Sequence, residues 1–332
     1  MNILVTGGTG FLGKRLVQKL IEKRHKVIVY SRHQHEDMPE KVEMVEGDIR
    51  DKEALEAAFF KNKIDAIYHL AISLNESDPD MYEINTKGTK NVSELARKYK
   101  IKQIIYMGSS GVLGETKTAA KEDFPYNPKT AYERSKMEGE KIVKSCGVPY
   151  TIARTTIIIG PNLIWAQIFE AARKGYPVIG EGTNYFHLVY VEDVVRLLVL
   201  VLGNKKALNQ TLHVASKDTP TYYQVYKMIA EELGVKMTDK KVPVALAYTA
   251  SYIHTIKRRL QRKRPSLTKS KSSIDRLIRN RIISTDKAKR LLGFEAKYDT
   301  RSAIRETIKY LKISRLGYSD YDLADIHKIK SD

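Results

Sequence analysis

Cysteine is nearly absent from this sequence, since only one of its 332 residues, Cys146, is a cysteine. A single cysteine excludes an intrachain disulfide framework and a zinc site built on cysteine ligands. Long apolar runs are also missing, because the longest, Leu197–Leu202, is far shorter than the roughly 20 residues of a membrane-spanning helix. Ile3–Val5 is too short for the apolar region of a secretory signal, which takes about 7–15 residues. We therefore expect a soluble, cytoplasmic protein.

Acidic residues are scarce beside basic ones, with 39 Asp and Glu against 58 Lys and Arg, and the formal net charge is +19. Such a charge suits a polyanionic partner. From Lys257 to Arg281 there are eleven basic residues and one acid, and the apolar stretch Val244–Ile256 precedes them. This pattern is typical of interfacial helices, so segment 244–281 either contacts an anionic membrane peripherally or is a solvated basic face. The basic residues lack interleaved aromatic residues, which argues against specific nucleic-acid binding.

Short apolar runs alternate with helical patterns over the first half of the chain. Helices are expected between these runs, and strands are predicted at 3–5, 27–30, 42–45, 64–70 and 104–107. Strands that are apolar on both faces and alternate with helices form a parallel sheet covered on both sides. The predicted fold class is therefore α/β, with a doubly wound parallel sheet.

The pattern changes after about residue 160. Further helices are predicted at 164–174, 194–202 and 222–233, a strand at 211–214, and one amphipathic helix within 285–311. With roughly 100–200 residues per domain, the length suits two coupled domains. We divide them into 1–160, with a return segment near 186–214, and a smaller domain at 161–332.

A glycine-rich loop, Thr6–Gly13, lies between the first predicted strand and the first predicted helix. Glycines at such a turn let the backbone approach a pyrophosphate, which then lies at the positive end of the helix. The loop therefore predicts a dinucleotide site, whose contacts are Gly7, Thr9, Gly10, Phe11, Leu12 and Gly13.

The second strand ends in Ser31 and Arg32. A site that prefers NAD usually places an acid here, whereas an arginine suits the 2′-phosphate of NADP. Ser31 occupies the place of the acid, so the sequence favours NADP as the cofactor, with NAD as the alternative.

Tyr132 and Lys136 are four residues apart in a segment with helical character, so their side chains share one helix face. An ammonium beside a phenol lowers a pKa that is about 10 in isolation. Such a tyrosine can exchange a proton with a carbonyl or alcohol oxygen near neutral pH. The pair follows a strand that ends in Ser109 and Ser110.

With these motifs the sequence resembles the extended short-chain dehydrogenases/reductases. The particular resemblance is to the NAD(P)-dependent epimerase/dehydratase family, which includes dihydroflavonol reductases and 3β-hydroxysteroid dehydrogenases. Thr6–Gly13 resembles the family's T-G-x-x-G-x-x-G. The other matching segments are Gly47–Asp51, Tyr68–Ala71, Asn85–Thr89, Arg154–Pro161 and Leu188–Val194. The resemblance covers nearly the whole chain, and it specifies the fold more closely than the substrate.

The resemblance implies a role for each matching residue. Tyr132 would be the general acid/base, and Lys136 would bind the nicotinamide ribose and lower the pKa of the tyrosine. Ser109, or alternatively Ser110, would orient the substrate oxygen. Asp48 would contact the adenine, and the remaining implied cofactor contacts are Ile49, Leu70, Ala71 and Asn85.

The sequence departs from the nucleotide-sugar members at Phe186 and His187, where those enzymes typically carry Arg-Asp. An aromatic ring cannot neutralise a diphosphate. This disfavours a nucleotide-sugar substrate, although Arg154 or Arg301 could supply the charge. His187 is interpreted either as a structural residue or as a proton relay or metal ligand. The histidines show no metal-ligand spacing, so we expect no metal.

The function that follows is an NADP-dependent oxidoreductase. It would transfer a hydride between nicotinamide and the carbonyl or secondary alcohol of a small, apolar substrate. The alternative is a nucleotide-sugar epimerase or dehydratase, and a third, less favoured hypothesis is a non-catalytic cofactor-binding scaffold. A homodimer is expected, because dimers are the commonest soluble assembly.

Overall fold

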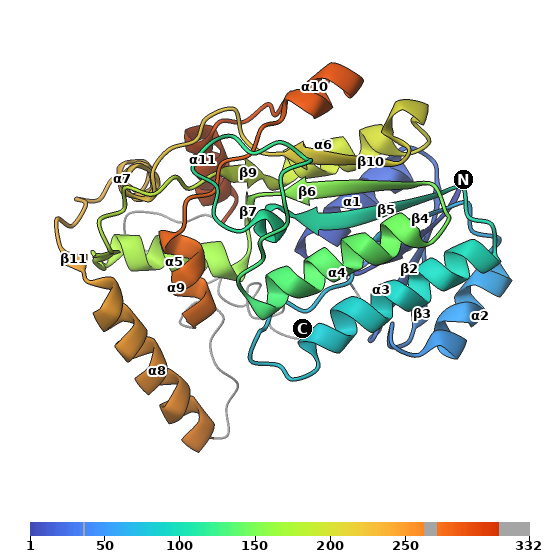
Figure 1. Ribbon diagram of the computed structural model, residues 1–332, viewed down its shortest axis with the longest axis horizontal. Coiled ribbons are helices and arrows are strands. Elements are labelled where there is room, and N and C mark those ends of the chain that lie inside the picture. Colours follow the sequence, from blue (N-terminus) through green and yellow to red (C-terminus); the bar gives the residue numbers. More distant parts are fainter. Residues whose placement is uncertain (36, 262–270, 312–332) are drawn as a thin grey trace.

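The centre of the molecule is a seven-stranded parallel sheet, seen in a computed structural model that describes residues 1–35, 37–261 and 271–311 (Figure 1). The strand order is β10-β6-β5-β4-β1-β2-β3, so the direction of winding reverses between β1 and β4. The strands are β1 (Asn2–Thr6), β2 (Lys26–Ser31), β3 (Val42–Glu46), β4 (Ala66–His69), β5 (Gln103–Ser109), β6 (Tyr150–Thr155) and β10 (Gln210–Val214). This confirms the predicted doubly wound α/β fold, in which ligands bind outside the carboxyl ends of the strands at the reversal.

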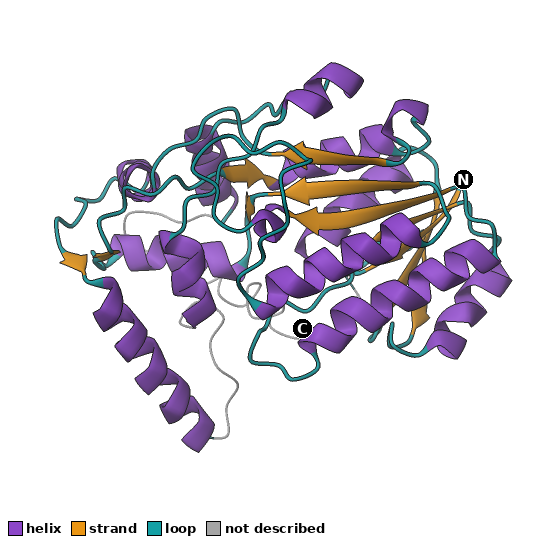
Figure 2. Cartoon of the chain, viewed as in Figure 1, coloured by secondary structure: helices purple, strands orange, loops and turns teal. Residues whose placement is uncertain are grey.

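Helices cover both faces of the sheet (Figure 2). On one face Leu16 and Leu197 pack with alternate strand residues such as Ile3, whereas Leu55 and Leu4 belong to the core of the opposite face. This alternation follows from strand geometry, because successive side chains point to opposite faces. The helices of the first face are α1 (Phe11–Glu22) and α6 (Val191–Val201), and those of the second are α2 (Lys52–Asn62), α3 (Met81–Lys98) and α4 (Ala131–Ser145).

After β6 the chain builds a second packed region and returns to the sheet through β10. A separate core cluster joins helices α5 (Leu163–Arg173), α7 (Tyr222–Glu232) and α11 (Thr300–Tyr310). Short parallel pairs connect β7 (Ile157–Ile159) with β9 (Leu188–Tyr190), and β8 (Val178–Ile179) with β11 (Lys241–Val242).

Helix α8 (Val244–Leu260) extends away from this region and packs on α9 (Lys271–Ile278) (Figure 1). Part of the predicted membrane segment, residues 262–270, lies outside the described residues. Across the described chain, no helix is both long enough and apolar enough to cross a bilayer.

The single helix predicted within 285–311 is wrong, because the structure has two helices there. Helix α10 (Asp286–Leu292) ends at Gly293, whose φ of +64° gives a left-handed cap. Glycine adopts this conformation without steric cost and commonly ends helices in this way. Helix α11 then begins at Asp299, whose side chain accepts a hydrogen bond from the backbone N–H of Ser302.

Candidate active site

The glycine-rich loop lies where the backbone leaves no room for side chains. Gly7 has a φ of +71°, and a Cβ atom there would lie 2.6 Å from the backbone N of Ala71. A Cβ atom on Gly13 would lie 2.2 Å from the carbonyl oxygen of Gly7. Gly10 caps α1, and no side chain in the described residues caps this helix end. Because the first N–H groups of a helix attract anions, this cradle fits the pyrophosphate of a dinucleotide.

The residues expected near the ribose lie beside this loop. Oγ of Ser31 is 3.3 Å from Oγ1 of Thr9. Arg32 is exposed, and no residue in the described part of the chain forms a hydrogen bond or ion pair with it.

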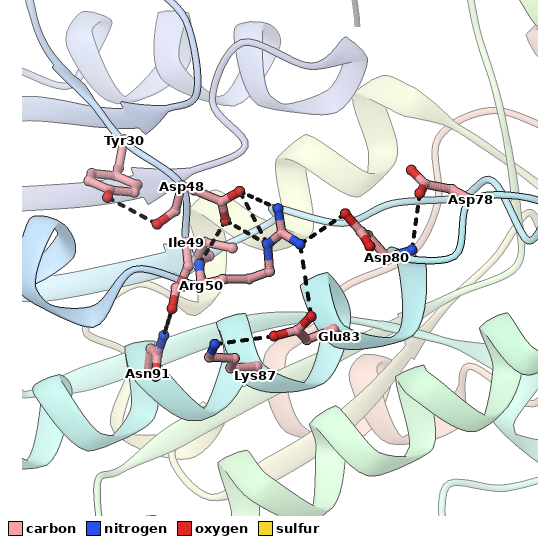
Figure 3. Close-up of polar contacts among 9 residues, drawn as sticks. All are labelled: Tyr30, Asp48, Ile49, Arg50, Asp78, Asp80, Glu83, Lys87 and Asn91. Carbon is pink, nitrogen blue, oxygen red and sulfur yellow. Dashed lines mark hydrogen bonds and ion pairs between the residues drawn. The ribbon is translucent and has the colours of Figure 1, made fainter.

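Asp48 lies after β3 and is held by Arg50 (Figure 3). Nη2 of Arg50 is 2.7 Å from one carboxylate oxygen of Asp48, and the backbone N–H of Arg50 donates to the other. The hydrogen bonds from Arg50 are the main cause that lowers the pKa of Asp48. Arg50 also donates to the carboxylate of Asp80, the residue before α3, so this network connects the loop after β3 to the start of α3.

Asn85 connects the loop after β4 to α4. Its side chain exchanges two hydrogen bonds with the backbone of Ser73 and donates a third to Oγ of Ser135 at 3.0 Å. Leu70 and Ile49 are buried and Ala71 is partly buried. Direct contact of Asp48, Ile49, Leu70, Ala71 and Asn85 with a cofactor stays a prediction.

The structure places Tyr132 near Ser109, and Lys136 follows one helical turn later on α4. Helix α4 begins at Thr130 with a capping box, in which the side chains of Thr130 and Glu133 each accept from the other's backbone N–H. This fixes Tyr132 in the first turn, facing the end of β5. There the hydroxyl of Ser109 is near enough to Tyr132 to oppose the rise in its pKa. Ser110 is buried and Ser109 is partly buried, and the role of Ser109 in orienting the substrate oxygen stays a prediction.

The electrostatics of the pair differ from the expectation. Burial raises the pKa of Tyr132 to about 12, and the charge of Arg276, the hydrogen bond with Ser109 and the charge of Arg281 oppose this rise. Burial lowers the pKa of Lys136 to about 7, against the opposing charge of Glu140. Nζ of Lys136 lies 4.1 Å from the ring centroid of Tyr106. The ammonium group of Lys136 thus faces the ring of Tyr106. The positive charges that oppose the rise in the pKa of Tyr132 belong to arginines and not to Lys136.

The lowered pKa of Lys136 predicts how stability depends on pH. From about pH 7 up to the ordinary lysine value of 10.5, the unfolded chain binds more protons than the folded chain. The free energy of unfolding therefore rises with pH in this window. We expect urea denaturation without cofactor to show a rise between about pH 7 and about pH 9, by up to about 1.4 kcal/mol per pH unit relative to Lys136→Met. Parallel curves for the two proteins would show that Lys136 is not desolvated.

Sequence reasoning missed the ionic cluster around Glu133. Glu133 is buried and forms ion pairs with Arg281 at 2.5 Å and with Arg279 at 3.5 Å. The two arginines come from the segment after α9, far away in the sequence. The high density of basic residues is the sequence signal for this cluster, but by itself it predicts only a membrane-facing or solvated segment.

Arg154 and Arg301 are the two alternatives for binding a diphosphate, and the structure contradicts the first of them. Arg154 is only 1% exposed and forms a buried ion pair with Glu140 at 2.7 Å. Arg301 is held by Glu231 and Glu232 of α7.

His187 has a structural role. Its Nε2 is 2.9 Å from the carbonyl oxygen of Ser216, and its Nδ1 accepts from the backbone N–H of Ile283 at 3.4 Å. Both ring nitrogens are thus engaged with the backbone. In the ranges that the structure describes, no group of three or more His, Cys, Asp or Glu residues is arranged to hold a metal ion.

The fold and this tyrosine–lysine–serine set define an NAD(P)-dependent enzyme of the extended short-chain dehydrogenase/reductase type. The sequence model of the NAD dependent epimerase/dehydratase family matches residues 3–215, and the chain belongs to this family.

Its relatives act on different substrates. A putative UDP-glucose 4-epimerase of Methanocaldococcus jannaschii is 31% identical over 70% of this chain and 83% of its own length. The sterol-4-alpha-carboxylate 3-dehydrogenase (decarboxylating) of Saccharomyces cerevisiae is 27% identical over 93% of this chain and 97% of its own. Among solved structures, the UDP-glucose 4-epimerase of Thermotoga maritima with UDP-glucose is 26% identical, with a TM-score of 0.76 over 94% of this chain and 99% of its own.

Proposed function

We propose that this enzyme is an NADP-dependent oxidoreductase that exchanges a hydride with the carbonyl or secondary alcohol carbon of a small, apolar substrate. The observation that carries this proposal is the placement of Ser109 at the end of β5 and of Tyr132 and the buried Lys136 on α4, with the Ser109 hydroxyl near enough to oppose the rise in the pKa of Tyr132. Two hydroxyl groups can hold one substrate oxygen, and Tyr132 donates its proton as negative charge develops there. The bound cofactor supplies or accepts the hydride.

An apolar substrate is supported by the residues beside the site. Phe186 is 5% exposed, and its ring centroid is 5.5 Å from that of Tyr222, so this position carries no charge for a diphosphate. The name of the yeast relative gives a sterol, which is an apolar substrate. We assign substrate binding mainly to residues 161–332.

The competing function is a nucleotide-sugar epimerase, which the names of the archaeal relative and of the Thermotoga structure favour. There the hydride returns to the substrate, so the cofactor shows no net change. The test is absorbance of NADPH with a panel of cyclic ketones and, separately, with UDP-glucose. Stoichiometric loss of NADPH with a ketone supports the oxidoreductase. Conversion of UDP-glucose without net loss, together with inert ketones, would replace it by the epimerase.

The cofactor preference depends on Arg32. An arginine forms a charge-assisted and often bidentate contact with a phosphate, and Ser31 brings no negative charge to oppose it. We expect tighter binding of NADPH than of NADH, and loss of that preference in Arg32→Ala, measured by fluorescence titration. Arg97→Ala, which removes an exposed arginine from α3, should keep the preference. Equal affinities in the wild-type protein would contradict the assignment.

We further propose that α8 attaches the enzyme peripherally to anionic membranes. Tyr252, Ile253 and Ile256 expose 69%, 60% and 41% of their surface on a helix that projects from the molecule (Figure 1). Residues three and four apart share a helix face, so these side chains form one apolar patch. The sequence continues from Lys257 with eight basic residues and no acid as far as Lys271. Such a pairing suits a surface of anionic lipid.

This attachment is testable by co-sedimentation with phosphatidylserine-containing and neutral vesicles. We expect binding to the anionic vesicles only, and less of it at high salt. Binding should weaken when four arginines are changed to glutamine: Arg258, Arg259, Arg262 and Arg264. A control that removes equal charge from other surfaces should bind like the wild type: Lys23, Lys61, Arg97 and Arg290. If the protein does not bind anionic vesicles at low salt, the attachment is wrong and segment 244–281 is a solvated basic face.

A further inference from the structure

Lys136 carries a buried ammonium group that the described chain leaves without an acidic partner. The residue is 3% exposed, and among residues 1–35, 37–261 and 271–311 nothing forms a hydrogen bond or ion pair with its Nζ atom. Glu140 attracts the charge of Lys136. However, three hydrogen bonds commit this carboxylate to Arg154 of β6. A buried charge without a partner is costly, so another contact must stabilise the ammonium group.

That contact is the aromatic ring of Tyr106, on β5. Nζ of Lys136 lies 4.1 Å from the centroid of this ring. The face of an aromatic ring attracts a cation within about 6 Å, and the attraction is strongest where water is excluded. Tyr106 is 1% exposed, so both partners are shielded from water. The ring therefore replaces part of the hydration that Lys136 loses on burial.

The ring of Tyr106 is held in place from α4 and from β4. A Cβ atom on Gly139, three residues after Lys136, would lie 2.2 Å from the hydroxyl oxygen of Tyr106. Glycine weakens the interior of a helix, but here it makes room for the ring beside the turn that carries the lysine. From β4, the ring centroid of His69 lies 5.5 Å from that of Tyr106. These two contacts fix the face that Tyr106 turns toward Lys136.

His69 is itself neutral and fixed at both ring nitrogens. Burial is the main cause that lowers the pKa of His69 to about 3, so the imidazole adds no positive charge beside the ammonium group. Oγ1 of Thr89 donates to the carbonyl oxygen of Asn85 at 2.6 Å, so it accepts from Nε2 of His69 at 2.9 Å. A neutral imidazole that donates at one nitrogen accepts at the other, and Nδ1 accepts from the hydroxyl of Thr6 at 2.8 Å. Since Thr6 begins the glycine-rich loop, this packing links the loop to the ring of Tyr106.

The other titratable groups that the described chain places around Lys136 do not take the role of the ring. His69 of β4 is neutral, and Glu140 of α4 is paired with the arginine of β6. Burial raises the pKa of Tyr132 to about 12, so its phenol keeps its proton and carries no charge. The charged form of the lysine therefore depends on the ring of Tyr106.

We propose that Tyr106 is a positioning residue, whose ring face holds the ammonium group of Lys136 in its charged form for contact with the nicotinamide ribose. This inference rests on the cofactor role of Lys136 in the proposed function. Tyr106 acts only through this lysine, and no bond of Tyr106 forms or breaks during the reaction.

The first test measures the pKa of Lys136 by NMR in full-length, cofactor-free protein with isotope-labelled lysine, where Lys136→Met identifies the signal. Tyr106→Phe keeps the ring and should titrate like the wild type. Adding one and then three fluorine atoms to that phenylalanine weakens the attraction for a cation with little change of shape. We expect the pKa to fall at each step, with about a tenfold higher proton-dissociation constant for the trifluorinated ring than for Tyr106→Phe. A pKa that stays constant along this series would overturn the inference.

The second test follows the affinity for NADPH against pH by fluorescence titration. Loss of the charge on Lys136 should weaken binding as pH rises, and in Tyr106→Leu this weakening should begin at a lower pH. Tyr106→Phe should keep the wild-type profile, and so should the control Tyr226→Leu, which removes a buried tyrosine from α7. Identical profiles for Tyr106→Leu and the wild type, or an equal shift in Tyr226→Leu, would contradict a role for the ring.

These outcomes are separable from those that test the proposed function. If Lys136 responds to the ring but the enzyme transfers no hydride to any ketone, the positioning role stands and the oxidoreductase is rejected. If NADPH is consumed with a ketone while the pKa of Lys136 is independent of the ring, the oxidoreductase stands and the positioning role is rejected.

Discussion

Tyr132→Phe is expected to bind NADPH like the wild type and to lose turnover on the order of 10²–10⁴-fold, the usual contribution of a general acid. The change removes one hydroxyl and keeps the ring, so the loop that receives the cofactor is untouched. The partner hydroxyl of Ser109 stays in place, but it cannot replace the proton that Tyr132 donates. The measurements are kcat on an accepted ketone and cofactor affinity by fluorescence titration.

The matched control is Tyr82→Phe, which removes the hydroxyl of a tyrosine that is 45% exposed on α3. This variant should keep wild-type kcat. If Tyr132→Phe also kept wild-type kcat, the tyrosine would not be the proton donor and the assigned chemistry would be wrong.

The largest loss of stability is expected when the buried ion pair between Glu140 of α4 and Arg154 of β6 is broken. Glu140 and Arg154 are 0% and 1% exposed, and three hydrogen bonds of 2.7–3.1 Å join them. Glu140→Gln would leave the guanidinium group buried without a counter-charge. Breaking such a pair typically costs about 3–5 kcal/mol, so we expect a loss of this size in the free energy of unfolding measured in urea.

An exposed ion pair gives the comparison. Glu83 and Lys87 are 3.1 Å apart on α3, and about half of each side chain is exposed. Glu83→Gln should lower the free energy of unfolding by no more than about 0.5 kcal/mol, because water and salt screen such pairs. Similar small losses for Glu83→Gln and Glu140→Gln would show that the charge of Glu140 does not stabilise the buried guanidinium group of Arg154.

The parts of the fold that the sequence predicts correctly are determined by residues close to one another in the chain. The apolar runs of the strands and the helical character of the segment with Tyr132 and Lys136 are local patterns, and each has the secondary structure expected of it. Gly293 is a local signal as well. It is followed by a stretch without helical periodicity, and these two features together indicate the end of α10, which the prediction of one helix overlooked.

Pairings between distant residues could not be predicted in this way. No periodicity connects Glu133 with Arg281, yet this ion pair holds the guanidinium group of Arg281 close to Gly111 and Ser109. The pKa of Tyr132 is raised because the side chain is buried by several elements. The sequence of α4 alone does not show which elements pack around it. Similarly, Arg154 matched a family landmark, but its partner Glu140 is revealed only by the packing of α4 against β6.

The most direct test of the central claim follows the hydride itself. NADPH carrying deuterium at C4 of the nicotinamide, in each of its two stereoisomers, is incubated with the enzyme and a ketone that it reduces. Mass spectrometry and NMR then locate the label in the product. We predict that one of the two stereoisomers places one deuterium on the carbinol carbon, in proportion to the NADPH oxidised. A product formed without label at that carbon from either stereoisomer, or with all label retained in the cofactor, would contradict direct hydride transfer between nicotinamide and substrate.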